Sequence, residues 1–435
     1  MNSLAVALAA DSAATVSDGN DDKIYNSANK LFMLSQAQPV GVMVHSNSSL
    51  LGIPWETIIK MFRAELGDAE LDTLEQYGEK FIQYLDGNDY LFPPETQKRF
   101  YLSLVETLYR GIVSAIEEKI YARIRDGEDI TDTSVIAKAE ILAAVDQWKA
   151  KNDAACFDGQ DVGSELAGTL SGEIHGHIVS VFGALQIDTD ASAALRELAI
   201  LVVNKDDILS ESLSGVVIAG FGRRDYFPVM QVFELGEVFK GRLKYRLAKS
   251  EKISASTPSV VQPFAQAEMV ETFLRGISPE IELRMIQEVV TAVVELPDVV
   301  IGAISDLTDV QKEHWRDKIR PQSAEALEAF VAKLEKHRLE KHLGPILRAI
   351  INLPIDELAH VAASLVNLNL FQKRMSLSPE TVGGPIDVAV ISKGDGFIWI
   401  ERKHYFREEL NTHYFDRRRR AAPTAKSNEG TSNGH

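Results

Sequence analysis

The chain has 435 residues, of which 45% are hydrophobic and 25% are charged, with 28 glycines and 15 prolines. This is the composition of an ordinary soluble globular protein, and it excludes collagen-like, disulfide-scaffold and wholly disordered proteins. The 46 Lys and Arg residues against 63 Asp and Glu residues give a formal charge of −17, which repels a phosphate backbone, so we expect no nucleic-acid partner.

Cysteine content and the two ends of the sequence bear on location. A single cysteine, Cys156, excludes an internal disulfide and a cysteine-based zinc cage and fits a reducing compartment. Residues 1–14 lack a basic leading segment, and no stretch of about 18 uncharged apolar residues occurs, so we expect a cytoplasmic protein without a secretory signal or a membrane partner. The run Arg417–Arg420 precedes a polar end and predicts a disordered basic and polar tail over 416–435.

Short apolar runs in the first fifty residues predict strands. Ser3–Ala9, Lys30–Ser35 and Pro39–Ser46 are rich in apolar residues and are separated by turn signals, including a loop at 17–22. Because these runs lack clean alternation, we expect burial on both faces. From Pro54 the spacing becomes that of a helix, with apolar residues at Trp55, Ile58, Ile59, Phe62 and Leu66.

Helical spacing continues to about residue 150. Apolar residues recur at every fourth position from Phe100 to Ile124, which predicts a long helix with a buried seam. The segment 85–94 is rich in Asp, Asn, Gly and Pro and predicts a loop. The polar, glycine-rich segment 152–172 predicts a linker or an exposed insertion.

Strand patterns return in the second half of the chain. Gly215–Phe221, Phe227–Leu235 and Phe239–Leu247 predict an antiparallel meander, and helical patterns follow over much of 270–375. A Lys-Gly-Asp-Gly turn between two apolar runs over 386–401 predicts a hairpin. Segregated blocks of strands and helices favour an α+β fold, built either from two facing sheets between helices or as an ordinary α+β sandwich.

Several of these segments resemble, in their order, those of a known family. Ala7–Thr15 ends an apolar strand in Ala-Ala-Asp-Ser, and Asn29–Leu34 places a lysine before a Leu-Phe-x-Leu strand. Pro39–Val44, the strand at 215–221 and the closing hairpin complete the set. Together they resemble proteasome subunits and their bacterial ring-protease relatives, which have the N-terminal-nucleophile hydrolase fold.

The resemblance implies a site and two of its residues. In that family the hydroxyl of an N-terminal Thr attacks the scissile carbonyl, its own α-amino group takes the proton, and a buried Asp and Lys orient and polarise the pair. By motif position, Asp11 matches that aspartate and Lys30 matches that lysine. The residues alone leave two other interpretations open, a structural ion pair or two unrelated surface charges.

The nucleophile is where the sequence departs from the family. The family's Thr opens a separate strand that has no counterpart in the sequence. Ser3 is the only hydroxyl near the start, but about 26 Å of extended chain, at about 3.3 Å per residue, separates it from Asp11. Thr15 and Thr57 are internal and carry no α-amine. We therefore expect the family's fold without its activity, or a nucleophile strand upstream of Met1.

These inferences give one expectation for the whole chain. Residues 1–415 form a single α+β domain, a four-layer αββα sandwich of the proteasome-like, N-terminal-nucleophile hydrolase type, with helical insertions at about 67–205 and 278–378. We expect a catalytically silent structural or regulatory member of a homo-oligomer, without a cofactor or metal. The alternatives are a peptidase or amidohydrolase, acting on a protein or peptide, whose nucleophile strand lies upstream of Met1 or whose processing exposes Ser3, and a protein-interaction module that works through its helices.

Three other clusters contain residue types that are found at binding sites. His175 and His177 would share one face of a strand, as metal ligands can, but no third ligand is evident. His45–Ser49 ends a strand ahead of a helix, where it could receive an anion or where its hydroxyls could cap the helix. Gly220–Asp225 is glycine-rich and basic, but it joins two predicted strands instead of opening a helix.

Overall fold

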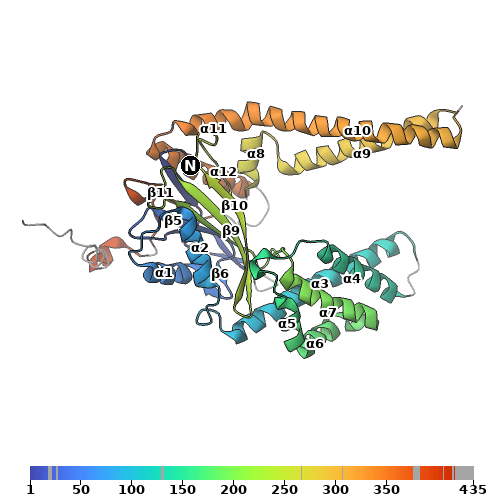
Figure 1. Cartoon of the computed structure of the whole chain (residues 1–435), viewed down its shortest axis with the longest axis horizontal. Coiled ribbons are helices and arrows are strands. Elements are labelled where there is room, and N and C mark those ends of the chain that lie inside the picture. The colour runs from blue at the N-terminus through green and yellow to red at the C-terminus, as the bar shows by residue number, and fades with distance from the viewer. Residues whose placement is uncertain are drawn as a thin grey trace, which may run out of the picture.

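The computed structural model of the chain describes every residue except 18–21, 26–27, 129–131, 266, 306, 376–382, 405, 414–415 and 417–435. It is a mixed α+β structure with antiparallel sheets, as the segregated sequence patterns predict. Figure 1 shows two groups of helices that project from the sheets toward the same side of the view. Apart from Asp416, the predicted tail lies outside the described residues.

The larger sheet has five strands in the order β10-β9-β8-β5-β4. Its antiparallel meander of β8, β9 and β10 confirms the prediction for the middle of the chain. Every residue of β8 is buried, which agrees with strands that are covered on both faces. The strands are β4 (Leu31–Met33), β5 (Val40–Ser46), β8 (Ser214–Gly220), β9 (Val229–Phe239) and β10 (Arg242–Lys252).

The smaller sheet has three strands in the order β1-β11-β12. The hairpin of β11 and β12 was predicted, and β1 pairs with β11 along its whole length, which leaves β1 at an edge. Two short ribbons complete the strands. The bounds are β1 (Ala5–Ala10), β11 (Asp387–Ser392) and β12 (Gly396–Glu401), with the ribbons β2 (Ala14–Ser17) and β3 (Asp22–Tyr25), and β6 (Ser49–Leu50) and β7 (Ile53–Pro54).

The two sheets face each other around a shared hydrophobic core. Gly41 of β5 shows how closely they approach, because a Cβ at that position would lie 2.7 Å from Ile391 of β11 and from Phe397 of β12. The core takes side chains from both sheets, among them Val6, Leu8, Met43, Val217, Val232, Ala389 and Ile391. Such interdigitation between two inner faces is typical of stacked sheets.

Helices cover the outer face of each sheet. Against the five-stranded sheet lie α1 (Trp55–Leu66) and α2 (Leu74–Leu85), and the predicted apolar stripe of α1 is buried there. Against the three-stranded sheet lie α11 (Gly344–Ile351) and α12 (Ile355–Met375). α2, α11 and α12 fall within the ranges expected as insertions, yet they pack on the sheets.

A second helical group has a hydrophobic core of its own. The long helix α3 buries Leu104, Ile112 and Ile116, as its sequence spacing predicts. Helices of this group pack on one another and reach the sheet through Phe239. The group comprises α3 (Pro94–Arg125), α4 (Thr133–Lys149), α5 (Val162–Thr169), α6 (Ser171–Phe182) and α7 (Thr189–Asn204).

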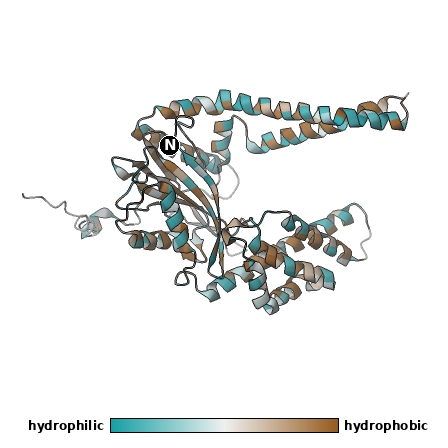
Figure 2. Ribbon diagram, in the orientation of Figure 1, coloured by the Kyte–Doolittle hydropathy of each residue, from teal (hydrophilic) through white to brown (hydrophobic). Residues whose placement is uncertain are grey.

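The third group forms an arm that projects from the sheets. It follows α8 (Glu268–Arg275) and consists of α9 (Pro279–Ala303), paired along its length with α10 (Asp309–Arg338) (Figure 1). Hydrophobic residues occur along much of α9 in Figure 2, but only Glu282 and Ile301 of this helix are buried. Among the described helices, none is both long and apolar enough to cross a membrane.

One prediction for the segment before α7 is wrong, and the structure adds detail to another. His175 and His177 lie in the helix α6 and not in a strand, because Ile174, Ile178 and Phe182 follow a helical period and are buried on one side. The segment 152–172 is not simply a linker, since α5 occupies part of it and buries Val162 and Gly163.

Candidate functional site

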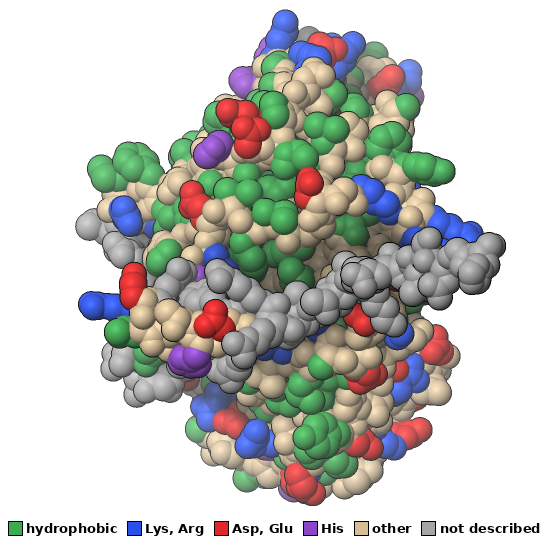
Figure 3. All heavy atoms as spheres, turned by 90° about the vertical axis from the view of Figure 1, so that its left-hand side faces the viewer, with side chains coloured by type: hydrophobic (Ala, Val, Ile, Leu, Met, Phe, Trp, Pro, Cys, Tyr) green, Lys and Arg blue, Asp and Glu red, His purple; other side chains and the backbone are tan. Residues whose placement is uncertain are grey.

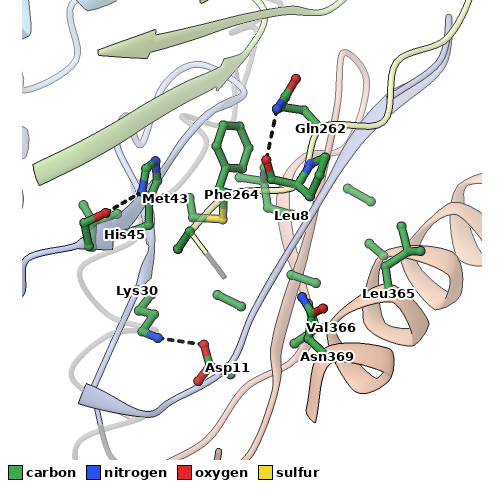
Figure 4. A pocket seen from close by; sticks show the side chains of 18 of the residues that line it. Leu8, Asp11, Lys30, Met43, His45, Gln262, Phe264, Leu365, Val366 and Asn369 are labelled. Atoms are coloured by element: carbon green, nitrogen blue, oxygen red, sulfur yellow. Dashed lines mark hydrogen bonds and ion pairs between the residues drawn. The ribbon is translucent and has the colours of Figure 1, made fainter. Parts of the chain in front are cut away.

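A cavity of about 1030 Å³ lies beside β1. Its walls are β1, the end of β5, the segment 260–265 and one face of α12. Figure 4 shows residues of α12, including Leu365, Val366 and Asn369, on the side opposite Lys30. Hydrophobic side chains also surround a hollow on the face of the molecule drawn in Figure 3. The cavity is as large as the largest typical binding sites of small molecules, which span about 300–1,000 Å³.

The structure brings Asp11 and Lys30 together at one end of this cavity (Figure 4). Asp11 follows β1 and Lys30 precedes β4, and the Lys30 Nζ lies 2.7 Å from the Asp11 Oδ1. The other oxygen, Oδ2, accepts hydrogen bonds from the backbone N–H groups of Ala13 and Gly383, each at 3.1 Å. With three donors, the carboxylate is held in one orientation, and the ammonium supplies positive charge to the cavity wall.

The candidate nucleophiles do not reach this pair. Ser3 is exposed and precedes β1, whereas Asp11 follows it, so the extended strand separates the two residues. Thr57 lies within α1. The ammonium group of Met1 donates a hydrogen bond to the Val260 carbonyl at 2.7 Å, and burial lowers its pKa to about 6. Among the contacts of the described residues, the Asp11–Lys30 pair therefore receives no hydrogen bond from Ser3, Thr57 or the Met1 ammonium group.

The strand end at His45 supplies the polar rim of the cavity. The ring of His45 stacks on Phe264 with centroids 5.3 Å apart, and its Nδ1 lies 3.1 Å from the Ser46 Oγ. The Nε2 is buried without a hydrogen-bond partner among the described residues, and burial lowers the pKa of the ring. The ring fits only because Gly215 has no side chain, since a Cβ there would lie 2.0 Å from Nε2.

The prediction that hydroxyls of this strand end cap the next helix is wrong. The ribbon β6–β7 intervenes, and α1 has Pro54 as its N-cap, without a side-chain hydrogen bond. Ser46 instead adopts a φ of 66°, a left-handed conformation that costs a non-glycine residue energy and is enriched at functional sites. The stacking of Phe264 on His45 could not be predicted from the sequence, because the two residues lie in segments far apart along the chain.

The outer edge of β1 has free backbone groups. The Asn2 N–H donates to the Ala5 carbonyl at 3.1 Å, across a tight turn, so the Ala5 backbone groups point away from β11. The directions of the backbone groups alternate along a strand. The N–H and C=O groups of Ala7 and Ala9 therefore also point away from β11, into the cavity that these residues line. Among the described residues, no hydrogen bond from outside the sheet reaches either of them.

The remaining predicted clusters lie elsewhere. Along α6, His177 Nδ1 lies 3.4 Å from Glu106, and His175 contacts Arg196 at 3.3 Å, so each imidazole has its own neighbour. The described part of the chain holds no group of three or more His, Cys, Asp or Glu residues arranged to bind a metal. Gly220–Asp225 joins β8 to β9 as predicted, and the Asp225 carboxylate accepts from the Leu74 N–H at the start of α2.

Three comparisons with known proteins found no match. No protein-family model matches the chain, no curated protein is similar to it, and no solved structure matches its fold.

Proposed function

We propose that this chain is a proteasome-like cytoplasmic protein, with a four-layer αββα fold of the N-terminal-nucleophile hydrolase type, that serves as a catalytically silent structural or regulatory member of a homo-oligomer. The observation that carries the proposal is the Asp11–Lys30 ion pair at the end of a cavity between elements of two facing sheets. The family's motif places an aspartate and a lysine at these positions. Catalytic silence is supported by the contacts of the pair, none of which, among the described residues, comes from Ser3, Thr57 or the Met1 ammonium group.

Membership of an assembly is supported by the α9–α10 arm. Helices that are hydrophobic on most sides are normally covered on most sides, yet α9 is packed mainly against α10. Large exposed apolar patches mark interaction sites. The exposed apolar residues of α9 are Ile281, Leu283, Val294, Leu296, Val299 and Val300.

Electron microscopy and light scattering of the purified protein test the assembly. We expect a closed dimer or ring, and a monodisperse monomer would contradict the proposal.

Incubation with a peptide β-lactone, which acylates an activated hydroxyl, tests catalytic silence. We expect an unchanged intact mass, and a stoichiometric adduct lost in Lys30→Ala would show an active site.

A second function, that of an N-terminal-nucleophile peptidase or amidohydrolase, is favoured by one observation. The turn at Asn2–Ala5 directs the chain before Met1 back along the free edge of β1, toward Asp11. A strand upstream of Met1 would therefore bring its own first residue near the ion pair. Processing that exposes Ser3 has no such support, because β1 separates Ser3 from Asp11. Intact mass of the protein from its native source separates these functions, since an additional strand that begins with Thr, Ser or Cys would favour the enzyme.

A further inference from the structure

The cavity beside β1 combines two properties that seldom occur together. One wall is a strand edge on which the N–H and C=O groups of Ala7 and Ala9 point outward. The walls on either side of this edge are apolar, with Met43 and Phe264 on one side and Leu365 and Val366 on the other (Figure 4). A free edge offers hydrogen bonds to another backbone, and apolar walls receive its side chains.

We propose that this cavity is a docking groove for an extended segment of a separate protein, which adds to the three-stranded sheet as a strand antiparallel to β1. The proposal rests on the silent function proposed above, in which no strand of the chain itself fills the groove. The direction follows from Met1 and Asn2, which already run antiparallel to β1 through the Asn2–Ala5 hydrogen bond. In an antiparallel pair, Ala7 and Ala9 would each exchange two hydrogen bonds with the ligand.

The groove defines the chemistry of its ligand. β1 runs from Ala5 to Ala10, and Asn2 and Met1 occupy the edge beside its first two residues, so about four ligand residues fit opposite Ala7–Ala10, at about 3.3 Å each. Alternate side chains face the core between the sheets or α12, and both walls are largely apolar. Beside Met43 and Phe264 or Leu365 and Val366, a charged side chain would lose its solvation, so an uncharged segment that alternates small and β-branched residues fits there. The charged residues Asp11 and Lys30 lie at one end of the cavity and already pair with each other.

Residues 1–435 of a second copy do not offer such a segment. The segments outside the described residues are short or polar, and 421–435 contains no apolar residue larger than Ala. The described apolar strands are already paired within their own sheets. The occupant therefore comes from another protein.

Fluorescence anisotropy with a dye-labelled probe peptide, five alternating Val and Ala residues followed by two Lys residues for solubility, tests the proposal. We expect saturable binding that Ala7→Pro weakens at least tenfold. Proline removes the outward N–H but not the bonds to β11, and it is tolerated at sheet edges. Ala7→Ser keeps the N–H and serves as the matched control.

Two further measurements keep the test decisive if Ala7→Pro folds poorly. Two probe peptides, N-methylated at odd or at even positions, are titrated into the unaltered protein, and their affinities should differ at least tenfold because one set of N–H groups faces β1. Leu365→Trp, which fills the groove from α12, should also abolish binding. The proposal would be overturned if the probe peptide shows no saturable binding, or if its binding is unaffected both by the position of N-methylation and by Leu365→Trp.

The oligomeric state separates this proposal from the function on which it rests. If Ala7→Pro changes the oligomeric state without any peptide, a second copy uses the edge and the separate partner is ruled out. If an upstream strand is found in the native protein, the groove is filled from within and the docking proposal fails. A monomer that binds the probe would contradict the proposed assembly but would leave the docking groove standing.

Discussion

The facing sheets and the α9–α10 arm both carry dense runs of Val, Ile and Leu, yet only the sheets bury them within the chain. All seven residues of β8 are buried, whereas Val294 and Val299 of α9 are 58% and 65% exposed. Runs of similar composition thus form a core in one region and an uncovered surface in the other. Apolar patterning identifies elements, but the neighbours of an element decide whether its apolar face is core or interface.

Truncation of one apolar side chain in each region should give the largest difference in the free energy of unfolding. Phe62→Ala, under the five-stranded sheet, removes a side chain that is 1% exposed, and we expect a loss of about 3–5 kcal/mol in the free energy of unfolding. Val299→Ala in the arm should change it by less than about 0.5 kcal/mol. Urea unfolding followed by circular dichroism measures both. Equal losses would show that the arm is as well packed as the core.

A buried carboxyl in the sheet should make stability fall as pH rises. Burial raises the pKa of Glu237, in β9, from 4.5 to about 7. Between these values the folded state holds a proton that the unfolded state has released, so stability is full below pH 4.5 and declines until about pH 7. Glu237→Gln should abolish this decline. From pH 4 to pH 8, the free energy of unfolding of the variant should therefore rise by about 3 kcal/mol relative to that of the unaltered protein.

The control for that titration is Glu95→Gln, which removes one carboxyl from the exposed first turn of α3. Unfolding measured in urea across the pH range should show the same slope for Glu95→Gln and the unaltered protein. A slope that Glu237→Gln leaves unchanged would show that burial of this carboxyl does not shape the pH dependence.

The Asp11–Lys30 pair should matter more than an ion pair on a helix surface. Lys30→Met leaves the carboxylate, whose side chain is 13% exposed, without its cation, and we expect a loss of about 1–3 kcal/mol. Lys60→Met breaks an exposed pair with Glu56 and should cost less than about 0.5 kcal/mol. In a double-mutant cycle, Asp11→Asn should recover part of the Lys30→Met loss. Purely additive losses would contradict the coupling.

A charge in the arm should change the free energy of unfolding least but should clearly reduce the size of the oligomer. Val299→Glu places a charge on the exposed face of the arm, so unfolding should change by less than about 0.5 kcal/mol. If the arm is an interface, the same charge is buried there without a partner, and light scattering should detect smaller oligomers. Gln311→Glu adds a charge to a polar position of the same arm and is the matched control. Unchanged assembly in Val299→Glu would exclude this face as the contact.

Much of the fold could be predicted because its signals are local. The apolar stripe of α1, the meander after Ser214 and the final hairpin follow from residues near one another in the sequence. The strand expected around His175 failed because two histidines with one residue between them fit a strand period, while the buried Ile174 and Ile178 follow a helical one.

The site could be predicted only in part. The proximity of Asp11 and Lys30 followed from a family motif, and their 2.7 Å contact agrees with it. The cavity itself could not be foreseen, because its walls come from β1, from 260–265 and from α12, which meet only in the folded chain. The stacking of Phe264 on His45 joins residues too far apart for any sequence period to report.

Native mass spectrometry of the protein from its own source tests the central claim most directly, because the masses of the intact assembly and of a subunit released from it give both the number of subunits and the mass of each. The account predicts a closed oligomer whose subunits carry no additional strand that begins with Thr, Ser or Cys. A monomer, or a subunit with such a strand, would contradict it.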